Sequence, residues 1–119
     1  MCPEHAHVLI VEDDPETVAL ERIMLERFGG HSVVGVIQTF QELPSVLAAL
    51  SVIPHAALVD MHLTRDHAAK EGAAISGELR RRFPDIAILG TSLEPAAYAD
   101  YNLGKPVKVG ELLKVITSL

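Results

Sequence analysis

Residues 7–15 read His7-Val8-Leu9-Ile10-Val11-Glu12-Asp13-Asp14-Pro15. The first five residues form a short apolar run, which predicts a strand buried on both faces of a parallel sheet. Asp14 before Pro15 is typical of a helix start, with the aspartate as N-cap and the proline in the first helical position. This stretch therefore predicts a buried strand that leads through acids into a helix.

Apolar runs and helix-period stretches keep alternating along the rest of the chain. Leu20, Ile23, Met24 and Phe28 continue the first helix at helical spacing until Gly29-Gly30 stops it. Further strands are predicted at 32–37, 56–60, 86–89 and, weakly, 102–104, and further helices at 41–50, 69–82 and 110–119, with a short segment at 93–100. Strand and helix alternate five times, which predicts an α/β fold with one parallel sheet, right-handed crossovers and helices on both faces.

Length and composition narrow the class of protein. The chain has 119 residues, so we expect residues 1–119 to form a single domain. A net charge of −6, with no basic patch beyond Arg80–Arg82, argues against direct nucleic-acid binding, and that run fits the polar end of a helix. No apolar run approaches the roughly 18 residues of a membrane helix, Met1–His7 lacks a signal-peptide core, and Cys2 has no disulfide partner. We therefore expect a cytoplasmic protein without membrane insertion.

Chemically active side chains follow the predicted strands. Glu12 and Asp13 end the first strand, Asp60 the third, Thr91 the fourth and Lys105 the fifth. The carboxyl ends of parallel strands meet at one edge of the sheet, where ligands bind. Three carboxylates there repel one another, and a Mg²⁺ ion, which accepts carboxylate ligands, removes that repulsion. A carboxylate nucleophile, a metal ion and a lysine are parts that phosphoryl transfer uses.

Each of these residues also has an ordinary interpretation. Glu12 and Asp13 could be solubilising loop acids, Asp60 and Thr91 could cap local structure, and Lys105 could lie in a plain turn. The set is more specific than any member because its members come in this order at the ends of successive strands. The six histidines form no motif with the spacing of a transition-metal site, so we expect them at the surface or in loops.

A resemblance to a known family lies in four segments: Val8–Asp14, Ala57–Asp60, Thr91–Ser92 and Lys105–Pro106. They are similar to the response-regulator receiver family of two-component signalling, in particular to its single-domain, chemotaxis-regulator-like members. The resemblance covers essentially the whole chain. It implies a flavodoxin-like three-layer sandwich, that is, a doubly wound five-stranded parallel sheet in the order 2-1-3-4-5.

The resemblance also implies roles for the site residues. Asp60 would accept a phosphoryl group from a histidine kinase or a histidine phosphotransfer protein. A Mg²⁺ ion would be held by oxygen ligands at the sheet edge, namely Glu12, Asp13, Asp60 and the main-chain carbonyl of His62. Lys105 and Thr91 would bind the phosphoryl oxygens, and the peptide bond before Pro106 would be cis.

Three features depart from the family pattern. Thr64 stands where a proline is usual, and the loop at 62–71 is longer than in the family. Asn102 stands where an aromatic of the fifth strand is usual, with Tyr101 one position early, and a shift of one residue in a strand points a side chain to the opposite face. The crossover at 91–101 has 11 residues, close to the lower limit for one that contains a helix, so we expect a shortened fourth helix.

Three functional interpretations follow. The leading one is a signalling phosphoacceptor, not an enzyme, whose partners are the phosphodonor protein and an unidentified downstream protein; self-association into a homodimer is left open. The second is a degenerate receiver that binds a partner constitutively, which Asn102 and the short crossover favour and the complete acid, lysine and threonine set opposes. The third, a phosphatase-like hydrolase with Asp60 as nucleophile, is opposed because the next acid along the chain is Asp66, six residues on.

Overall fold

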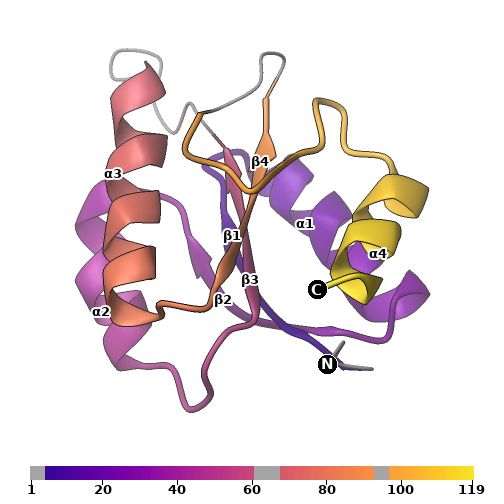
Figure 1. The fold of residues 1–119 in the computed structure, drawn as a ribbon, viewed down its shortest axis with the longest axis horizontal. Coiled ribbons are helices and arrows are strands. Elements are labelled where there is room, and N and C mark those ends of the chain that lie inside the picture. Colours follow the sequence, from indigo (N-terminus) through magenta and orange to yellow (C-terminus); the bar gives the residue numbers. More distant parts are fainter. Residues whose placement is uncertain (1–4, 61–67, 93–96) are drawn as a thin grey trace.

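Five parallel strands form one sheet at the centre of the molecule (Figure 1). The computed structural model describes residues 5–60, 68–92 and 97–119. The strands are β1 (His7–Val11), β2 (Ser32–Ile37), β3 (Ala56–Asp60), β4 (Ala87–Thr91) and β5 (Tyr101–Asn102). Their order is β2-β1-β3-β4-β5, and every neighbouring pair is parallel. The doubly wound sheet predicted from the sequence is confirmed.

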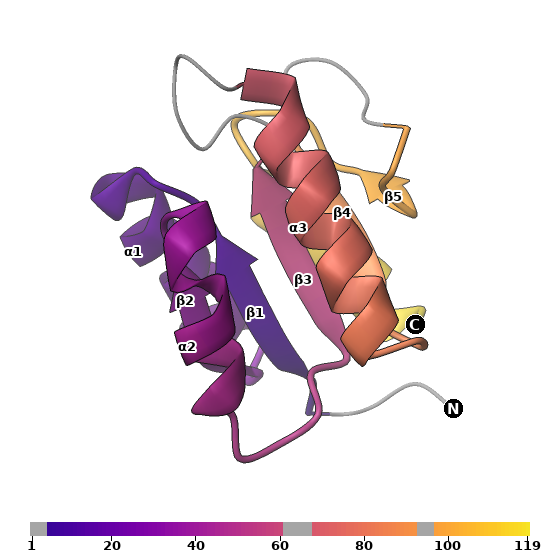
Figure 2. The same cartoon turned by 90° about the vertical axis from the view of Figure 1, so that its left-hand side faces the viewer.

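Helices cover both faces of this sheet and complete three layers. They are α1 (Pro15–Ile23), which continues as a π-helical turn, η1 (Met24–Phe28), then a 3-10 turn, η2 (Phe40–Glu42), α2 (Leu43–Ala48), α3 (Ala68–Arg82) and α4 (Val109–Thr117). Figures 1 and 2 show α1 and α4 on one face and α2 and α3 on the other. Among the described residues, no helix has both the length and the apolar character needed to cross a bilayer.

Two apolar clusters hold the layers together, one on each face of the sheet. Alternate residues of a strand point to opposite faces, so Ile10 packs toward α1 and α4 while Leu9 packs toward α2 and α3. Fully burying such a side chain contributes roughly 1.5–3 kcal/mol. The larger members of the first cluster are Leu25, Leu58, Leu89, Leu112 and Ile116, and those of the second are Ile37, Ile75, Leu79 and Ile88.

The first helix begins as predicted but buries a different set of side chains. The Asp14 carboxylate accepts hydrogen bonds from the Thr17 N–H at 3.3 Å and the Thr17 hydroxyl at 2.6 Å, and Gly30, at φ 67°, follows the last turn. Of the four apolar residues whose spacing predicts this helix, Met24 is buried, whereas the other three are exposed: Leu20, Ile23 and Phe28. A π-helical turn spans Met24–Phe28, and such a turn shifts the angular spacing on which a 3.6-residue period depends.

The fourth crossover and the fifth strand differ from the prediction. Residues 97–100 form a turn and a bend, so the short helix expected at 93–100 does not reach them, and residues 93–96 lie outside the described part. The strand occupies Tyr101–Asn102 instead of 102–104. Asp100 explains the early start: its N–H donates to the Ile88 carbonyl at 2.8 Å, and its carboxylate accepts from the Ile88 N–H at 2.8 Å.

Candidate functional site

Two buried acids and one exposed acid meet at the carboxyl ends of β1 and β3. Glu12 directly follows β1, where its N–H donates to the Ile37 carbonyl at 3.0 Å, and Asp60 is the last residue of β3. Both are almost fully buried, whereas Asp13 is exposed. One carboxylate oxygen from each of the three lies within 4.8 Å of the others. The structure thus brings together the three carboxylates that the sequence places at neighbouring strand ends.

A lysine lies between the two buried acids. Lys105 follows β5, and its Nζ is 3.1 Å from Glu12 Oε1 and 3.2 Å from Asp60 Oδ2. Burial lowers the pKa of Lys105, but the hydrogen bond that its ammonium donates to Glu12 and the charge of Asp60 outweigh burial and leave the pKa raised. The peptide bond between Lys105 and Pro106 is cis, as the resemblance implies. The ammonium is therefore held charged beside both carboxylates.

Thr91 completes the group at the end of β4. It lies directly opposite Asp60 in the register of β3 and β4 and is 1% exposed. Neighbouring strands are about 4.8 Å apart, so this register places a hydroxyl-bearing residue next to the Asp60 carboxylate. The predicted neighbourhood of Thr91 and Asp60 is confirmed, and the predicted role of the hydroxyl stays a prediction.

The site carries more negative than positive charge among the described residues. Three carboxylates face one ammonium, which leaves two negative charges. Desolvation and then the neighbouring Glu12 raise the pKa of Asp13 above its ordinary value, as expected where like charges crowd together. A divalent cation with oxygen ligands would balance this excess, so the donor set fits Mg²⁺.

Two predictions about this region concern residues beyond the acids and the lysine. His62, the fourth predicted metal ligand, lies outside the described residues. Asn102 is exposed, and so is Tyr101, at 39%. Neither residue of the fifth strand therefore supplies a buried aromatic beside Thr91, which is the departure from the family pattern that the sequence shows.

Sequence reasoning missed two buried polar groups close to this site. Glu21 of α1 is 2% exposed, and neither of its carboxylate oxygens has a hydrogen-bond partner among the described residues. Burial, and after it the charge of Glu12, raises the pKa of Glu21 to about 8. Tyr98 is half-buried, with its hydroxyl likewise unpartnered in the described part of the chain, and burial followed by the charge of Asp60 raises its pKa to about 12. Hydrophobic periodicity does not identify Glu21 as buried, because the apolar residues Leu20 and Ile23 of the same helix are exposed.

Histidines gather at the opposite end of the sheet, where the strands begin. His31 Nδ1 accepts the Ala6 N–H at 2.9 Å, and His55 Nδ1 accepts the His7 N–H at 2.9 Å. The rings of His7 and His55 stack with their centroids 5.2 Å apart. His31 is 7% exposed and lies in the loop before β2, so the prediction of surface or loop histidines holds for it by its loop position and not by exposure. It is buried because its ring nitrogen satisfies a main-chain donor of the segment that leads into β1.

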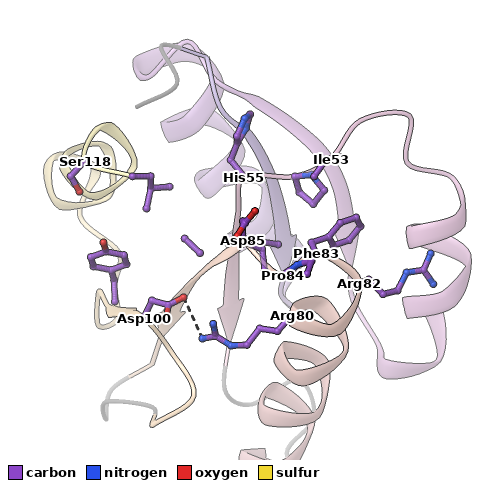
Figure 3. A pocket seen from close by; sticks show the side chains of 14 residues that line it. Ile53, His55, Arg80, Arg82, Phe83, Pro84, Asp85, Asp100 and Ser118 are labelled. Carbon is purple, nitrogen blue, oxygen red and sulfur yellow. Dashed lines mark ion pairs between the residues drawn. The ribbon is translucent and has the colours of Figure 1, made fainter. Parts of the chain in front are cut away.

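A cavity of about 980 Å³ lies at the same end of the sheet (Figure 3). His55, Phe83 and Asp85 are among the residues that line it. Arg80, in the last turn of α3, crosses it to bind the Asp100 carboxylate at 3.3 Å and the Tyr98 carbonyl at 2.6 Å. The arginine run thus lies at a helix end, as predicted, and Arg80 ties α3 to the segment before β5. This cavity holds no part of the acid and lysine group.

Comparisons with known proteins agree with the geometry. The sequence matches no family model and no curated protein. The structure is similar to the signal receiver domain of a modulated diguanylate cyclase from Desulfovibrio desulfuricans G20, with a TM-score of 0.76 and 28% identity over 93% of this chain and 90% of that chain. It is also similar to a CheY-like response regulator receiver domain protein from Methanospirillum hungatei JF-1, with a TM-score of 0.76 and 22% identity over 95% and 91% of the two chains.

A third similar structure is the isolated REC domain of RcsB from Salmonella enterica serovar Typhimurium, solved in the presence of phosphomimetic BeF3⁻. Its TM-score is 0.71, at 21% identity over 92% of this chain and 84% of that chain. The chain therefore has the fold of response-regulator receiver domains, and the family resemblance seen in the sequence motifs is confirmed.

Proposed function

We propose that this chain is a phosphoacceptor receiver of a two-component system, in which Asp60 takes a phosphoryl group from a histidine kinase or a histidine phosphotransfer protein. One observation carries the proposal: Lys105 Nζ lies within 3.2 Å of Asp60 Oδ2, in a site where Glu12 and Asp13 bring two further carboxylates. Phosphoryl transfer needs an acceptor oxygen, a metal ion and a positive charge beside the phosphoryl group. Here the acceptor is a buried carboxylate oxygen, neighbouring carboxylates can hold the metal ion, and the ammonium supplies the positive charge.

The metal ligands in this proposal are Glu12, Asp13 and Asp60, with the His62 carbonyl as a predicted fourth. Mg²⁺ bound there would neutralise charge on the transferred group and on the acids around it. The receiver domain of RcsB, whose fold this chain shares, was solved with the phosphomimetic BeF3⁻, which supports a phosphorylated state for this chain as well.

In the transfer, an oxygen of the Asp60 carboxylate attacks phosphorus while the phosphorus–nitrogen bond of a phosphohistidine breaks. The electron pair of that bond goes to the histidine nitrogen. The other ring nitrogen of the reacting phosphohistidine carries a proton, so the ring leaves as a neutral imidazole, and Asp60 becomes an acyl phosphate. The Lys105 ammonium, already charged beside Asp60, stabilises the added negative charge, and Thr91 can donate its hydroxyl hydrogen to a phosphoryl oxygen. Burial of Asp60 limits access of bulk water to the acyl phosphate.

The output in this proposal is a contact with another protein, and the chain is not an enzyme that turns over a substrate. The degenerate-receiver interpretation predicts the same fold but no phosphorylation. It is not favoured, because a set of residues suited to phosphoryl transfer lies together at the carboxyl ends of the strands, which supports the phosphoacceptor interpretation: Glu12, Asp60, Thr91 and Lys105.

Acetyl phosphate with Mg²⁺, followed by intact mass spectrometry, tests the proposal. The wild type should gain the mass of one phosphoryl group, and Asp60→Asn should not. Asp85→Asn, which changes an exposed aspartate at the other end of the sheet, is the matched control and should label like the wild type. Full labelling of Asp60→Asn, or labelling that EDTA leaves unchanged, would show that the site is wrongly assigned.

A further inference from the structure

The strand that leads to Lys105 is very short. β5 pairs with β4 through two residue pairs, Leu89 with Tyr101 and Gly90 with Asn102, whereas β3 and β4 pair through five. Lys105, three positions after β5, nevertheless places its Nζ within 3.2 Å of two carboxylate oxygens. Contacts beyond this two-residue ladder therefore have to hold the segment in place.

Asp100 extends the pairing of β4 and β5 with its side chain. Its N–H donates to the Ile88 carbonyl at 2.8 Å, and its Oδ2 accepts from the Ile88 N–H at 2.8 Å. In a regular parallel ladder, the Ile88 N–H would donate to the main-chain carbonyl two residues before Asp100, which is that of Tyr98. That carbonyl instead accepts from Arg80 Nη2 at 2.6 Å. The Asp100 carboxylate thus takes the place of a main-chain acceptor.

Arg80 binds the same carboxylate from α3. Its Nη2 is 3.3 Å from Asp100 Oδ2, and Figure 3 shows this ion pair across the cavity. Both side chains are 38% exposed, and an ion pair so open to solvent contributes little by itself. A hydrogen bond from a main-chain N–H to a carboxylate is stronger than one to a neutral oxygen. We therefore assign the anchoring of this segment mainly to the bond between Ile88 and Asp100.

The chain runs directly from this anchor to the lysine. After Asp100, the Leu103 N–H donates to the Gly90 carbonyl at 2.9 Å, and the Leu103 side chain lies in the apolar cluster shared with α1 and α4. Gly104, at φ 77°, turns the chain just before Lys105. A shift at Asp100 would move this whole segment, and a misplacement of about 1 Å in a reacting site can cost about 100-fold in rate.

We propose that Asp100 is a positioning residue for phosphoryl transfer: by completing the pairing of β4 and β5 at Ile88, it holds Lys105 beside Asp60. This inference rests on the proposed function, in which Lys105 acts on the phosphoryl group. Asp100 itself lines the cavity of Figure 3, which holds no part of the acid and lysine group, so its effect on the reaction passes through the position of Lys105.

Labelling by acetyl phosphate at saturating Mg²⁺ tests the proposal with two variants at one position. Asp100→Ala removes the acceptor of the Ile88 N–H and should slow labelling about ten-fold. Asp100→Asn keeps an acceptor oxygen without the charge and should label within about three-fold of the wild-type rate. Asp85→Ala changes an exposed aspartate of the same cavity and should label at the wild-type rate. Equal rates for the wild type and Asp100→Ala would overturn the proposal.

Two further measurements separate positioning from a general loss of structure. The predicted metal ligands lie on or next to β1 and β3, so Asp100→Ala should keep its Mg²⁺ affinity, followed by amide NMR, within about two-fold. In a Lys105→Met background, Asp100→Ala should slow labelling by less than about two-fold more, because the side chain that it positions is gone. A weakened Mg²⁺ site, or the same ten-fold loss in both backgrounds, would mean that Asp100 supports the whole fold and would overturn the proposal.

The carbon-13 shift of Lys105 Cε provides a test that needs no phosphorylation. Lys105 Nζ is 3.2 Å from Asp60 Oδ2, so Asp60→Asn should change this shift in otherwise wild-type protein. The change should be largely lost in Asp100→Ala and kept in Asp100→Asn. Failure of the wild type to label would contradict the proposed function, and this shift would still decide whether Asp100 positions Lys105. A full response in Asp100→Ala would overturn the inference.

Discussion

The two ends of the sheet differ in how their buried polar side chains are paired. At the carboxyl ends, Glu12 and Asp60 are buried carboxylates that share one lysine. At the amino ends, His31 and His55 accept main-chain N–H groups and so remain neutral. Among the described residues, the carboxyl ends of the strands therefore carry an excess of negative charge. At the amino ends, each of these two histidines has a hydrogen-bond partner in the main chain. Excess buried charge indicates a site for an outside group, whereas an internally satisfied cluster indicates a structural role.

The largest effect should come from removing Lys105, the cation that pairs with both buried acids. Lys105→Met takes this counter-charge from the two buried carboxylates, so the free energy of unfolding without metal should fall by about 3 kcal/mol. Mg²⁺ should restore much of this loss, because a divalent cation can replace the ammonium. Urea unfolding with Mg²⁺ and with EDTA measures both effects.

Lys114→Met is the matched control for that variant. Lys114 is exposed on α4, and its loss should change stability by less than about 0.5 kcal/mol. If Lys105→Met were as stable as this control in EDTA, the two ends of the sheet would not differ in the way described.

A smaller effect should come from acidifying the histidine end. Burial lowers the pKa of His31 and of His55 below the ordinary value of 6.5, with the charges of nearby His5 and His7 acting in the same direction. An imidazole whose pKa is lower in the folded protein contributes stability that is present above about pH 6.5 and is lost as the pH falls below it. The loss is at most about 1.4 kcal/mol per pH unit for each histidine.

Thermal unfolding from pH 7.5 to pH 5.5 tests this prediction in wild type and His55→Gln. The glutamine can accept the His7 N–H through its side-chain oxygen but cannot titrate. The difference between the two proteins cancels the contribution of the carboxylates, and the wild type should lose more stability on acidification. Parallel profiles would mean that His55 is not held neutral by the fold.

The smallest effect concerns Tyr98, an aromatic residue on which the charge of Asp60 acts. The Tyr98 hydroxyl is buried without a partner in the described part of the chain, so Tyr98→Phe should leave the free energy of unfolding unchanged or raise it by up to about 1 kcal/mol. Tyr101→Phe changes an exposed ring and should have no measurable effect. A loss of more than about 1 kcal/mol in Tyr98→Phe would show that the hydroxyl has a partner and is internally satisfied like the histidines.

The sequence predicts the sheet well because buried parallel strands leave a clear pattern. The runs Val8–Val11 and Ala56–Val59 are apolar throughout, and the strands that contain them span His7–Val11 and Ala56–Asp60, as predicted. The acids and Lys105 were predictable for a related reason, since topology alone brings strand ends to one edge. The position of β5 was less predictable, because the Asp100 side chain, which no periodicity reports, replaces part of the strand pairing.

Buried polar residues were the main failure of sequence reasoning. Glu21 is an acid on a helix whose apolar residues Leu20 and Ile23 are exposed, so hydrophobic periodicity indicates the wrong face. His31 is buried because of a single hydrogen bond to a segment 25 positions away. Such contacts depend on side-chain packing between distant segments, which local spacing does not encode.

The most direct test of the contrast between the two ends is a titration with Mn²⁺, a paramagnetic substitute for Mg²⁺, followed by amide NMR. The strongest broadening is expected at Glu12, Asp13 and Asp60; excess Mg²⁺ should reverse it, and Asp60→Asn should abolish it. Histidine also binds Mn²⁺, so the other end of the sheet serves as an internal comparison. Broadening centred on His7 and His55, and unchanged in Asp60→Asn, would contradict the assignment of the acid end as the cation site.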